Sequence, residues 1–282
     1  MYSQIRSILK SNGIKLSKLK SQHFLINKDI LLKEVEAGNL VSNDRVIEIG
    51  AGIGNLTRIL AEKVKHVTAI EIDKELVKIL RKELIEYNNV EIVNENVLKL
   101  EDSIFKNKKI ISNPPYNISS PLLLKIIRSQ YKDCVITFQL EFGQRLFAKP
   151  NSANYSRLTV RVNYNTNIKY IMNISRKNFY PIPQVDSILL KIMPKTPVIH
   201  VENEDRYFYL VNKLFNHKNQ LVQKVMKNRL KRMKLDRKFI DNFIEKLPYR
   251  ELRVRNLDNS KIKEIFDYLN EYNTELKEYW NI

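Results

Sequence analysis

The sequence has only one cysteine in 282 residues, Cys134, and it lies within the apolar run 134–138. A single cysteine excludes an internal disulfide and favours a reducing compartment, and its apolar neighbours indicate a small core residue rather than a nucleophile. No stretch approaches the roughly eighteen apolar residues of a membrane span, and the amino terminus lacks an apolar segment followed by a cleavage site. We therefore expect a cytoplasmic protein that does not bind a membrane.

Acidic residues are also scarce, with 31 Asp and Glu against 49 Lys and Arg, which gives a formal net charge of +18. A field of this sign attracts polyanions and speeds encounters with nucleic acid, although a merely solvated basic surface is the alternative. Two segments concentrate the charge. Residues 1–28 contain six Lys or Arg and no acid, and residues 224–238 contain eight Lys or Arg. We expect the first to be a mobile arm until it meets phosphate or folds back, and the second to contact phosphate.

Glycine is rare as well, but three of the six glycines, Gly50, Gly52 and Gly54, fall within five residues. They follow the predicted strand 45–49, where a turn needs positive φ or close approach of the backbone to a ligand. Glu71 closes the next predicted strand, where its carboxylate can bind both hydroxyls of a ribose. The sixth position of a dinucleotide-binding G-x-G-x-x-G pattern is Asn55 here, which weakens a nicotinamide reading.

Short apolar strands alternate with helical patterns up to about residue 192. This alternation predicts an α/β fold with a Rossmann-like parallel sheet covered on both faces. Segments 168–174 and 187–192 have no long helix between them and predict an antiparallel pair at one edge. Beyond residue 195 the pattern is helical only. We expect a basic arm at 1–28, an α/β domain at 29–195 and a small all-helical domain at 196–282.

The sequence Asn113-Pro114-Pro115-Tyr116 follows the predicted strand 109–112. An amide oxygen, a backbone carbonyl outside any ladder and an aromatic face at one strand end suit an exocyclic amine on a flat ring. Together with the glycine turn, this set indicates methylation of an amino group on a nucleobase. It selects S-adenosylmethionine as the cofactor over a dinucleotide.

These blocks resemble the ribosomal RNA adenine N6-dimethyltransferases of the KsgA type, with the erythromycin-resistance methylases as close relatives. The resemblance is close over residues 18–195 and loose over the helical tail. It implies that 29–195 is an S-adenosylmethionine-binding methyltransferase domain and that 196–282 is an RNA-binding domain. It rests on five blocks in the same order: Ser21–Leu25, Glu48–Gly52, Glu71–Asp73, Asn113–Pro121 and Phe179–Ser187.

The resemblance implies roles for individual residues. The cofactor would be held by His23, Leu25, Gly50, Gly52, Glu71, Ile72, Asn96 and Asn113. Catalysis would fall to Asn113, Pro114, Tyr116 and Phe179, with the two aromatic rings on either side of the target adenine. The implied partner is rRNA in a small ribosomal subunit or its precursor, bound by a monomer, and no metal is expected.

Three places depart from the family pattern. Gln22-His23 replaces the commoner Gln-Asn, which is a mild change. Asn96 stands where the family has an Asp that receives the adenine amine of the cofactor, and Glu95 beside it is a possible substitute. Pro114 stands where the dimethylases usually have Leu or Ile, and it is typical of DNA adenine methylases that add one methyl group. A large-subunit rRNA or DNA adenine methylase, and a non-catalytic RNA-binding assembly factor, therefore stay open as alternatives.

Overall fold

The computed structural model describes residues 2–14, 22–272 and 276. The chain forms two compact units, one of residues 1–143 and 166–195 and the other of residues 144–165 and 196–282. The predicted arm falls partly outside the described residues, including Lys15, Lys18 and Lys20, and so does Ser21 of the first motif.

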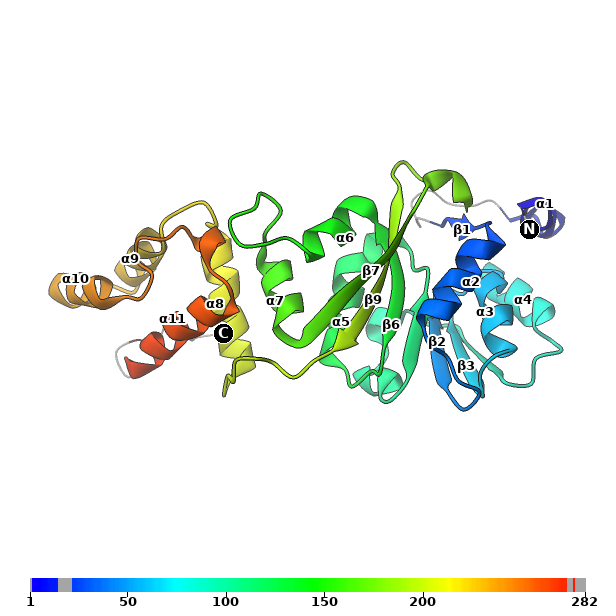
Figure 1. Cartoon of the computed structure of the whole chain (residues 1–282), viewed down its shortest axis with the longest axis horizontal. Helices are drawn as coiled ribbons and strands as arrows, with labels where there is room; N and C mark the ends of the chain where they lie inside the picture. The colour runs from blue at the N-terminus through cyan, green and yellow to red at the C-terminus, as the bar shows by residue number, and fades with distance from the viewer. Residues whose placement is uncertain (1, 15–21, 273–275, 277–282) are drawn as a thin grey trace. The chain divides into compact units, whose positions relative to one another are not determined.

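The first unit is built on a seven-stranded sheet in the order β4-β3-β2-β5-β6-β9-β7. The first five strands in this order are parallel, whereas β9 runs antiparallel to both β6 and β7, and β7 and β9 lie side by side in Figure 1. The parallel sheet and its antiparallel pair are as predicted. The strands are β2 (Arg45–Ile49), β3 (His66–Ile70), β4 (Val90–Val93), β5 (Lys109–Ser112), β6 (Cys134–Gln139), β7 (Thr166–Ile174) and β9 (Ser187–Pro194).

Three helices connect successive parallel strands, as the crossovers of a parallel sheet require: α3 (Asn55–Ala61), α4 (Lys74–Glu83) and α5 (Ser119–Arg128). Helix α2 (Lys28–Ala37) precedes β2, and α6 (Leu140–Leu146) follows β6. The one-turn 3₁₀ helices are η2 (Val97–Lys99) and η3 (Asp102–Phe105), both between β4 and β5, η4 (Tyr116–Ile118) and η5 (Arg176–Asn178). Strands β2, β3 and β5 are buried after their first residue, which explains their near-continuous apolar sequences.

Local contacts set the starts of two helices. Asn27 caps α2, because its side chain accepts hydrogen bonds from the backbone N–H groups of Asp29 and Ile30. Helix α5 begins at Ser119, since η4 leads directly into it and places Ile118 at the cap position.

The described part of the basic arm is a helix, α1 (Tyr2–Ser11), which the sequence analysis missed. Its Ile5 and Leu9 are buried in a cluster with Ile53 and Leu76. The arm therefore folds back on the first unit through an apolar stripe, and its charges face away from that stripe. A short two-stranded sheet follows, in which β1 (Phe24–Leu25) pairs with β8 (Phe179–Tyr180).

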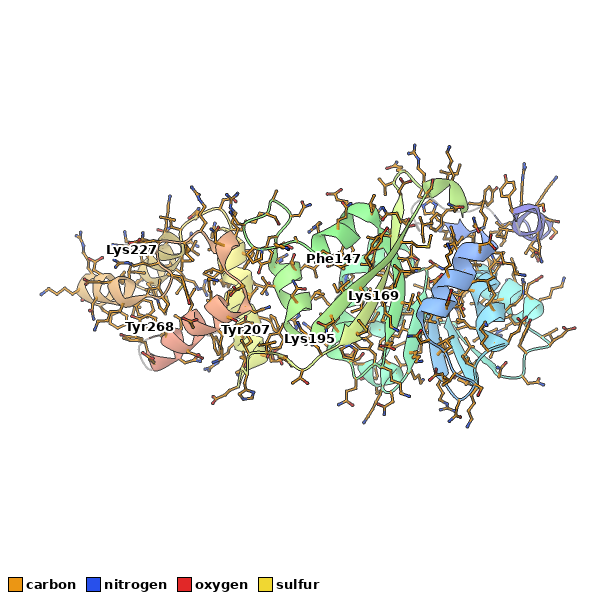
Figure 2. All side chains as sticks on the ribbon, viewed as in Figure 1. Phe147, Lys169, Lys195, Tyr207, Lys227 and Tyr268 are labelled. Carbon is orange, nitrogen blue, oxygen red and sulfur yellow. The ribbon has the colours of Figure 1, made fainter. Side chains whose placement is uncertain are left out.

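The second unit is helical. It contains α7 (Arg157–Asn165), α8 (Glu204–Phe215), α9 (Val222–Arg232), α10 (Arg237–Lys246), η6 (Val254–Asn256) and α11 (Asn259–Glu271). Tyr207, labelled in Figure 2, is wholly buried here and donates a hydrogen bond to the Asn259 side chain over 2.8 Å. In neither unit do the described residues include a helix long and apolar enough to cross a membrane.

The predicted boundary between the two domains needs a correction. Residues 144–165, assigned to the methyltransferase domain, group with the C-terminal helices. The reason is aromatic packing: the ring of Tyr164 on α7 lies 5.7 Å from that of Tyr207 and 5.2 Å from that of Phe208. Helix α7 was not predicted because its sequence, with Thr159, Val160 and Val162, is rich in β-branched residues.

A buried ion pair anchors the start of β5 and gives a stability prediction. Lys109 Nζ lies 2.8 Å from Asp44 Oδ2, and the two side chains are 13% and 7% exposed. We expect Lys109→Met to lower the free energy of unfolding by about 3 kcal/mol, because it leaves a buried carboxylate without its cation. Urea denaturation measures the change, with Lys78→Met as the control in the exposed pair Lys78–Glu75. Equal losses in the two variants would contradict the assignment.

Candidate active site

The site begins where β2 and β5 part. Their ladder pairs only Val46 with Lys109 and Ile47 with Ile110. Beyond it, the Ser112 hydroxyl bridges the gap, donating to the Ile49 carbonyl over 2.6 Å and accepting from the Ile49 N–H over 3.3 Å. The chain order reverses between these strands, and a cavity of about 410 Å³ is lined by residues at their carboxyl ends.

The glycine turn borders this cavity and cannot accommodate side chains. Gly50 and Gly52 have φ of +76° and +59°, where other residues are strained. A Cβ on Gly50 would lie 3.1 Å from Pro115 Cδ, and one on Gly52 would lie 2.6 Å from Phe24 Cε1. The turn therefore lies directly against the Asn113–Tyr116 segment, which follows the next strand of the sheet.

Glu71 is buried at the end of β3 with its carboxylate fixed by the backbone. Its two oxygens accept hydrogen bonds from the N–H groups of Gly52 and Asp73, each over 2.9 Å. Burial raises the pKa of Glu71 above its usual range, and these two bonds partly offset the rise. The carboxylate is held rigidly, and each oxygen keeps a lone pair for a hydroxyl group.

Asn96 lines the same cavity at the end of β4, together with Ile72. Its Oδ1 accepts the N–H of Leu98 over 3.0 Å and so caps η2, while the neighbouring Glu95 carboxylate accepts the Asn96 N–H over 2.8 Å. The amide oxygen is therefore already partly used. Its Nδ2 is a hydrogen-bond donor, where an Asp would offer a second acceptor.

Asn113 is held by a residue that the sequence analysis missed. Its Nδ2 donates to Oε2 of Glu34 on α2 over 2.7 Å. Its Oδ1 is buried and has no hydrogen-bond partner within residues 2–14, 22–272 and 276. Glu34 lies on the same face of α2 as the buried Ile30, Leu31 and Val35, so a charged residue among apolar positions was the available signal.

Buried carboxyl groups gather behind the cavity. Burial raises the pKa of Glu34 to about 8, and the Asn113 hydrogen bond offsets part of the rise. Burial also raises the pKa of Glu48 on β2 well above its usual range, and the charges of Glu34 and Glu71 add to it. Two such groups close together favour the protonated state at neutral pH.

Tyr116 lies on the opposite side of the Asn113 segment, in η4. Its ring stacks with that of His23 at a centroid distance of 6.0 Å, and its hydroxyl lies 2.6 Å from Ser187 Oγ. Burial raises the pKa of Tyr116 to about 12. His23 is fixed in turn, because its Nδ1 lies 2.7 Å from the Pro181 carbonyl oxygen.

Phe179 and Leu25 are paired across β1 and β8, and both side chains belong to the same buried cluster. Phe179 still lines the cavity although it is only 2% exposed. Leu25 is not among the residues that line the cavity, and its side chain is buried in the cluster. A contact between Leu25 and the cofactor stays a prediction.

All the other residues assigned from the sequence line this one cavity: His23, Gly50, Gly52, Glu71, Ile72, Asn96, Asn113, Pro114, Tyr116 and Phe179. Gln22, quoted in the first motif without a role, also lines it and donates to Asp73 over 3.0 Å. Within the described residues, no cluster of His, Cys, Asp or Glu could hold a metal ion. The cavity combines a glycine cradle, a fixed carboxylate, an amide acceptor and aromatic rings.

Comparison with known proteins identifies the family of this chain. The model of the ribosomal RNA adenine dimethylase family matches residues 14–271. The chain belongs to this family. Its members use S-adenosylmethionine as the methyl donor, so the protein is an S-adenosylmethionine-dependent methyltransferase enzyme of the rRNA adenine dimethylase type.

Individual relatives agree over nearly the full length. The chain is 38% identical over 251 residues to a Pyrococcus furiosus protein named "Probable ribosomal RNA small subunit methyltransferase A", covering 88% of this chain and 90% of that one. It is 34% identical over 248 residues to the Clostridium botulinum ribosomal RNA small subunit methyltransferase A, covering 86% and 89%.

Solved structures confirm the fold of the family. A dimethyladenosine transferase from Plasmodium falciparum is similar with a TM-score of 0.75 and 31% identity, covering 88% of this chain and 98% of that one. The 23S rRNA methyltransferase ErmE is similar with a TM-score of 0.64 and 25% identity, covering 88% and 99%. A Rossmann-like methyltransferase sheet with C-terminal helices is thus established.

The raised pKa of Glu34 predicts a pH-dependent stability. The folded state holds a proton that the unfolded state loses, so the stability present at low pH falls as the pH rises from about 5 through about 8. Glu34→Gln removes this pH dependence, because Gln does not ionise. Between about pH 5 and pH 8, the unfolding free energy of the wild type should fall by about 1.4 kcal/mol per pH unit relative to that of the variant. Denaturant titrations at several pH values measure it, with Glu36→Gln, an exposed position of α2, as control. Parallel curves for wild type and Glu34→Gln would contradict it.

Proposed function

We propose that the protein transfers methyl groups from S-adenosylmethionine to N6 of adenines in small-subunit rRNA, and that it dimethylates two adjacent adenines during ribosome biogenesis. The observation that carries the proposal is Asn113, which lines the cavity beside the glycine turn and whose buried Oδ1 has no hydrogen-bond partner among the described residues. A buried acceptor without a partner is costly, and an amine N–H of the substrate would satisfy it. The names of the small-subunit relatives support the choice of rRNA.

The residues present fit the methyl donor. Gly50 and Gly52 leave a cradle that side chains would fill, and Glu71 offers two fixed oxygens for ribose hydroxyls. Asn96 and Ile72 would border the adenine of the cofactor, and His23 would close the cavity from the amino-terminal side. S-adenosylmethionine, when bound, supplies an electrophilic methyl group on its sulfonium sulfur.

Asn113 and Pro114 would orient the amine of the target base. The lone pair of adenine N6 is delocalised into the ring, which makes the nitrogen a poor nucleophile. With Asn113 Oδ1 and the Pro114 carbonyl accepting its two N–H groups, the nitrogen becomes pyramidal and its lone pair faces the methyl group. Positioning and electrostatics then supply the rate, and no covalent enzyme intermediate is needed.

Tyr116 and Phe179 would bound the target base. An adenine taken out of its stack needs aromatic surfaces in exchange. The ring of Tyr116 is held in place for stacking by the hydrogen bond between its hydroxyl and Ser187 and by the neighbouring ring of His23. Phe179 is so buried that we assign it the inner wall of the nucleobase pocket. After the first methyl transfer, N6 keeps only one N–H. The methylated amine must therefore rotate beside the ring of Pro114 before a second methyl group can be transferred.

The positive charge of the chain supports binding of a large RNA. Helix α9 carries Lys224, Lys227, Arg229, Lys231 and Arg232, and Lys227 is labelled in Figure 2. Such residues contact phosphate and position the enzyme without reading sequence. We propose that the helical unit binds rRNA of the small subunit or its precursor, and that the protein acts as a cytoplasmic monomer.

The test is methylation of undermethylated small ribosomal subunits with labelled S-adenosylmethionine, followed by RNA digestion and nucleoside mass analysis. We expect N6,N6-dimethyladenosine from the wild type and a loss of at least about 100-fold in rate for Asn113→Ala. N6-methyladenosine alone would contradict dimethylation and point to Pro114 as the limit. Transfer only to large-subunit RNA or to DNA would contradict the proposed substrate.

Asn96 provides a gain-of-function prediction. Its oxygen already caps η2, so an Asp at this place would add an acceptor for the adenine amine of the cofactor. We expect Asn96→Asp to tighten S-adenosylmethionine binding about tenfold, which corresponds to about 1.4 kcal/mol. Isothermal titration calorimetry measures the Kd, with Asn88→Asp, an exposed position before β4, as the control. Unchanged or weaker binding would show that Asn96 does not face the cofactor adenine.

A further inference from the structure

A buried carboxyl group touches the side chain that the proposed mechanism depends on. Glu34 is 0% exposed on α2, and its Oε2 lies 2.7 Å from Asn113 Nδ2. Its other oxygen has no hydrogen-bond partner in the described part of the chain. Burying a carboxyl group costs free energy that a Leu at this position of the apolar helix face would not cost. The hydrogen bond to Asn113 compensates for part of the cost of placing Glu34 here.

The consequence of this bond follows from the shape of an amide group. The nitrogen and oxygen of the Asn113 amide point in directions about 120° apart, so a nitrogen held at Glu34 turns the oxygen away from α2. Asn113 lines the cavity, and its oxygen is without a partner. Without an acceptor at position 34, a 180° rotation of the Asn113 amide would cost little free energy. The rotated amide would point its N–H groups, instead of its oxygen, at the N–H groups of the target amine.

We propose that Glu34 is a positioning residue that fixes the Asn113 amide with Oδ1 toward the amine of the target base. This inference rests on the proposed role of Asn113. Glu34 also polarises the amide, because an acceptor on Nδ2 increases the negative charge on Oδ1. That charge stabilises the positive charge that develops on N6 as the methyl group arrives.

The bond needs only an acceptor opposite Nδ2. A neutral carboxyl group keeps a carbonyl oxygen for this purpose and an ionised one has two, so both states serve. A Gln at position 34 keeps such an oxygen, whereas Leu and Met have none. These substitutions separate the acceptor from side-chain volume and from charge.

The experiment compares Glu34→Gln, Glu34→Leu and Glu34→Met with wild type in the small-subunit methylation assay, and Glu36→Gln is the control for loss of an exposed carboxylate from α2. We expect kcat to fall about 10- to 100-fold in the Leu and Met variants, with the Kd for S-adenosylmethionine within about twofold of wild type. Glu34→Gln should keep kcat within about threefold. Melting curves report which variants are folded.

Several results would overturn the inference. Wild-type kcat in a folded Leu or Met variant would show that the bond is not needed. Equal losses in Gln and Leu variants would show that the effect does not depend on an acceptor. Unfolding of both apolar variants, with the Gln variant folded, would assign Glu34 a structural role only. Asn113→Ala distinguishes failure of the proposed function from failure of this inference. If Asn113→Ala is active, the proposed role of Asn113 is wrong. If Asn113→Ala is inactive while Glu34→Leu is active, only the positioning role of Glu34 is wrong.

Discussion

The parting of β2 and β5 is the constraint on which the site depends. After two paired positions the strands separate, and the Ser112 hydroxyl satisfies the backbone groups of Ile49 that the ladder leaves open. Because both strands end at this point, the glycine turn after one and the Asn113 segment after the other come within van der Waals distance. The cofactor cradle and the acceptors for the amine thereby share one cavity.

Buried acids surround this cavity in a protein with a large excess of positive charge. Glu71 is fixed by backbone N–H groups. Burial raises the pKa of both Glu34 and Glu48, and the charges of Glu34 and Glu71 raise that of Glu48 further. Keeping such groups inside lowers the stability of the fold as the pH rises. Buried polar groups at such sites lower the stability of the fold, but they hold the acceptor in the orientation that the reaction needs. An acceptor oriented in advance avoids reorganisation during the reaction.

The sequence predicted most of the sheet because each strand is a short apolar run bounded by turn residues. It also predicted the cavity, since motifs after successive parallel strands must meet at one edge. Glu34 escaped notice because its partner is 79 residues away, and a Glu in an amphipathic helix usually faces water. Helix α7 was missed because its β-branched residues favour a strand, and aromatic packing with α8 overrides that preference. Helix α1 was missed because its charge obscured the apolar stripe of Ile5 and Leu9.

The central claim is that the parted strands hold the methyl donor against the Asn113 segment. A crystal structure of the protein with S-adenosylhomocysteine, the product of methyl transfer, tests it directly. The account predicts the ribose hydroxyls at Glu71, the adenine beside Asn96, and the sulfur facing the cavity wall formed by Asn113 and Tyr116. A ligand bound with its sulfur away from Asn113, or with its ribose away from Glu71, would contradict it.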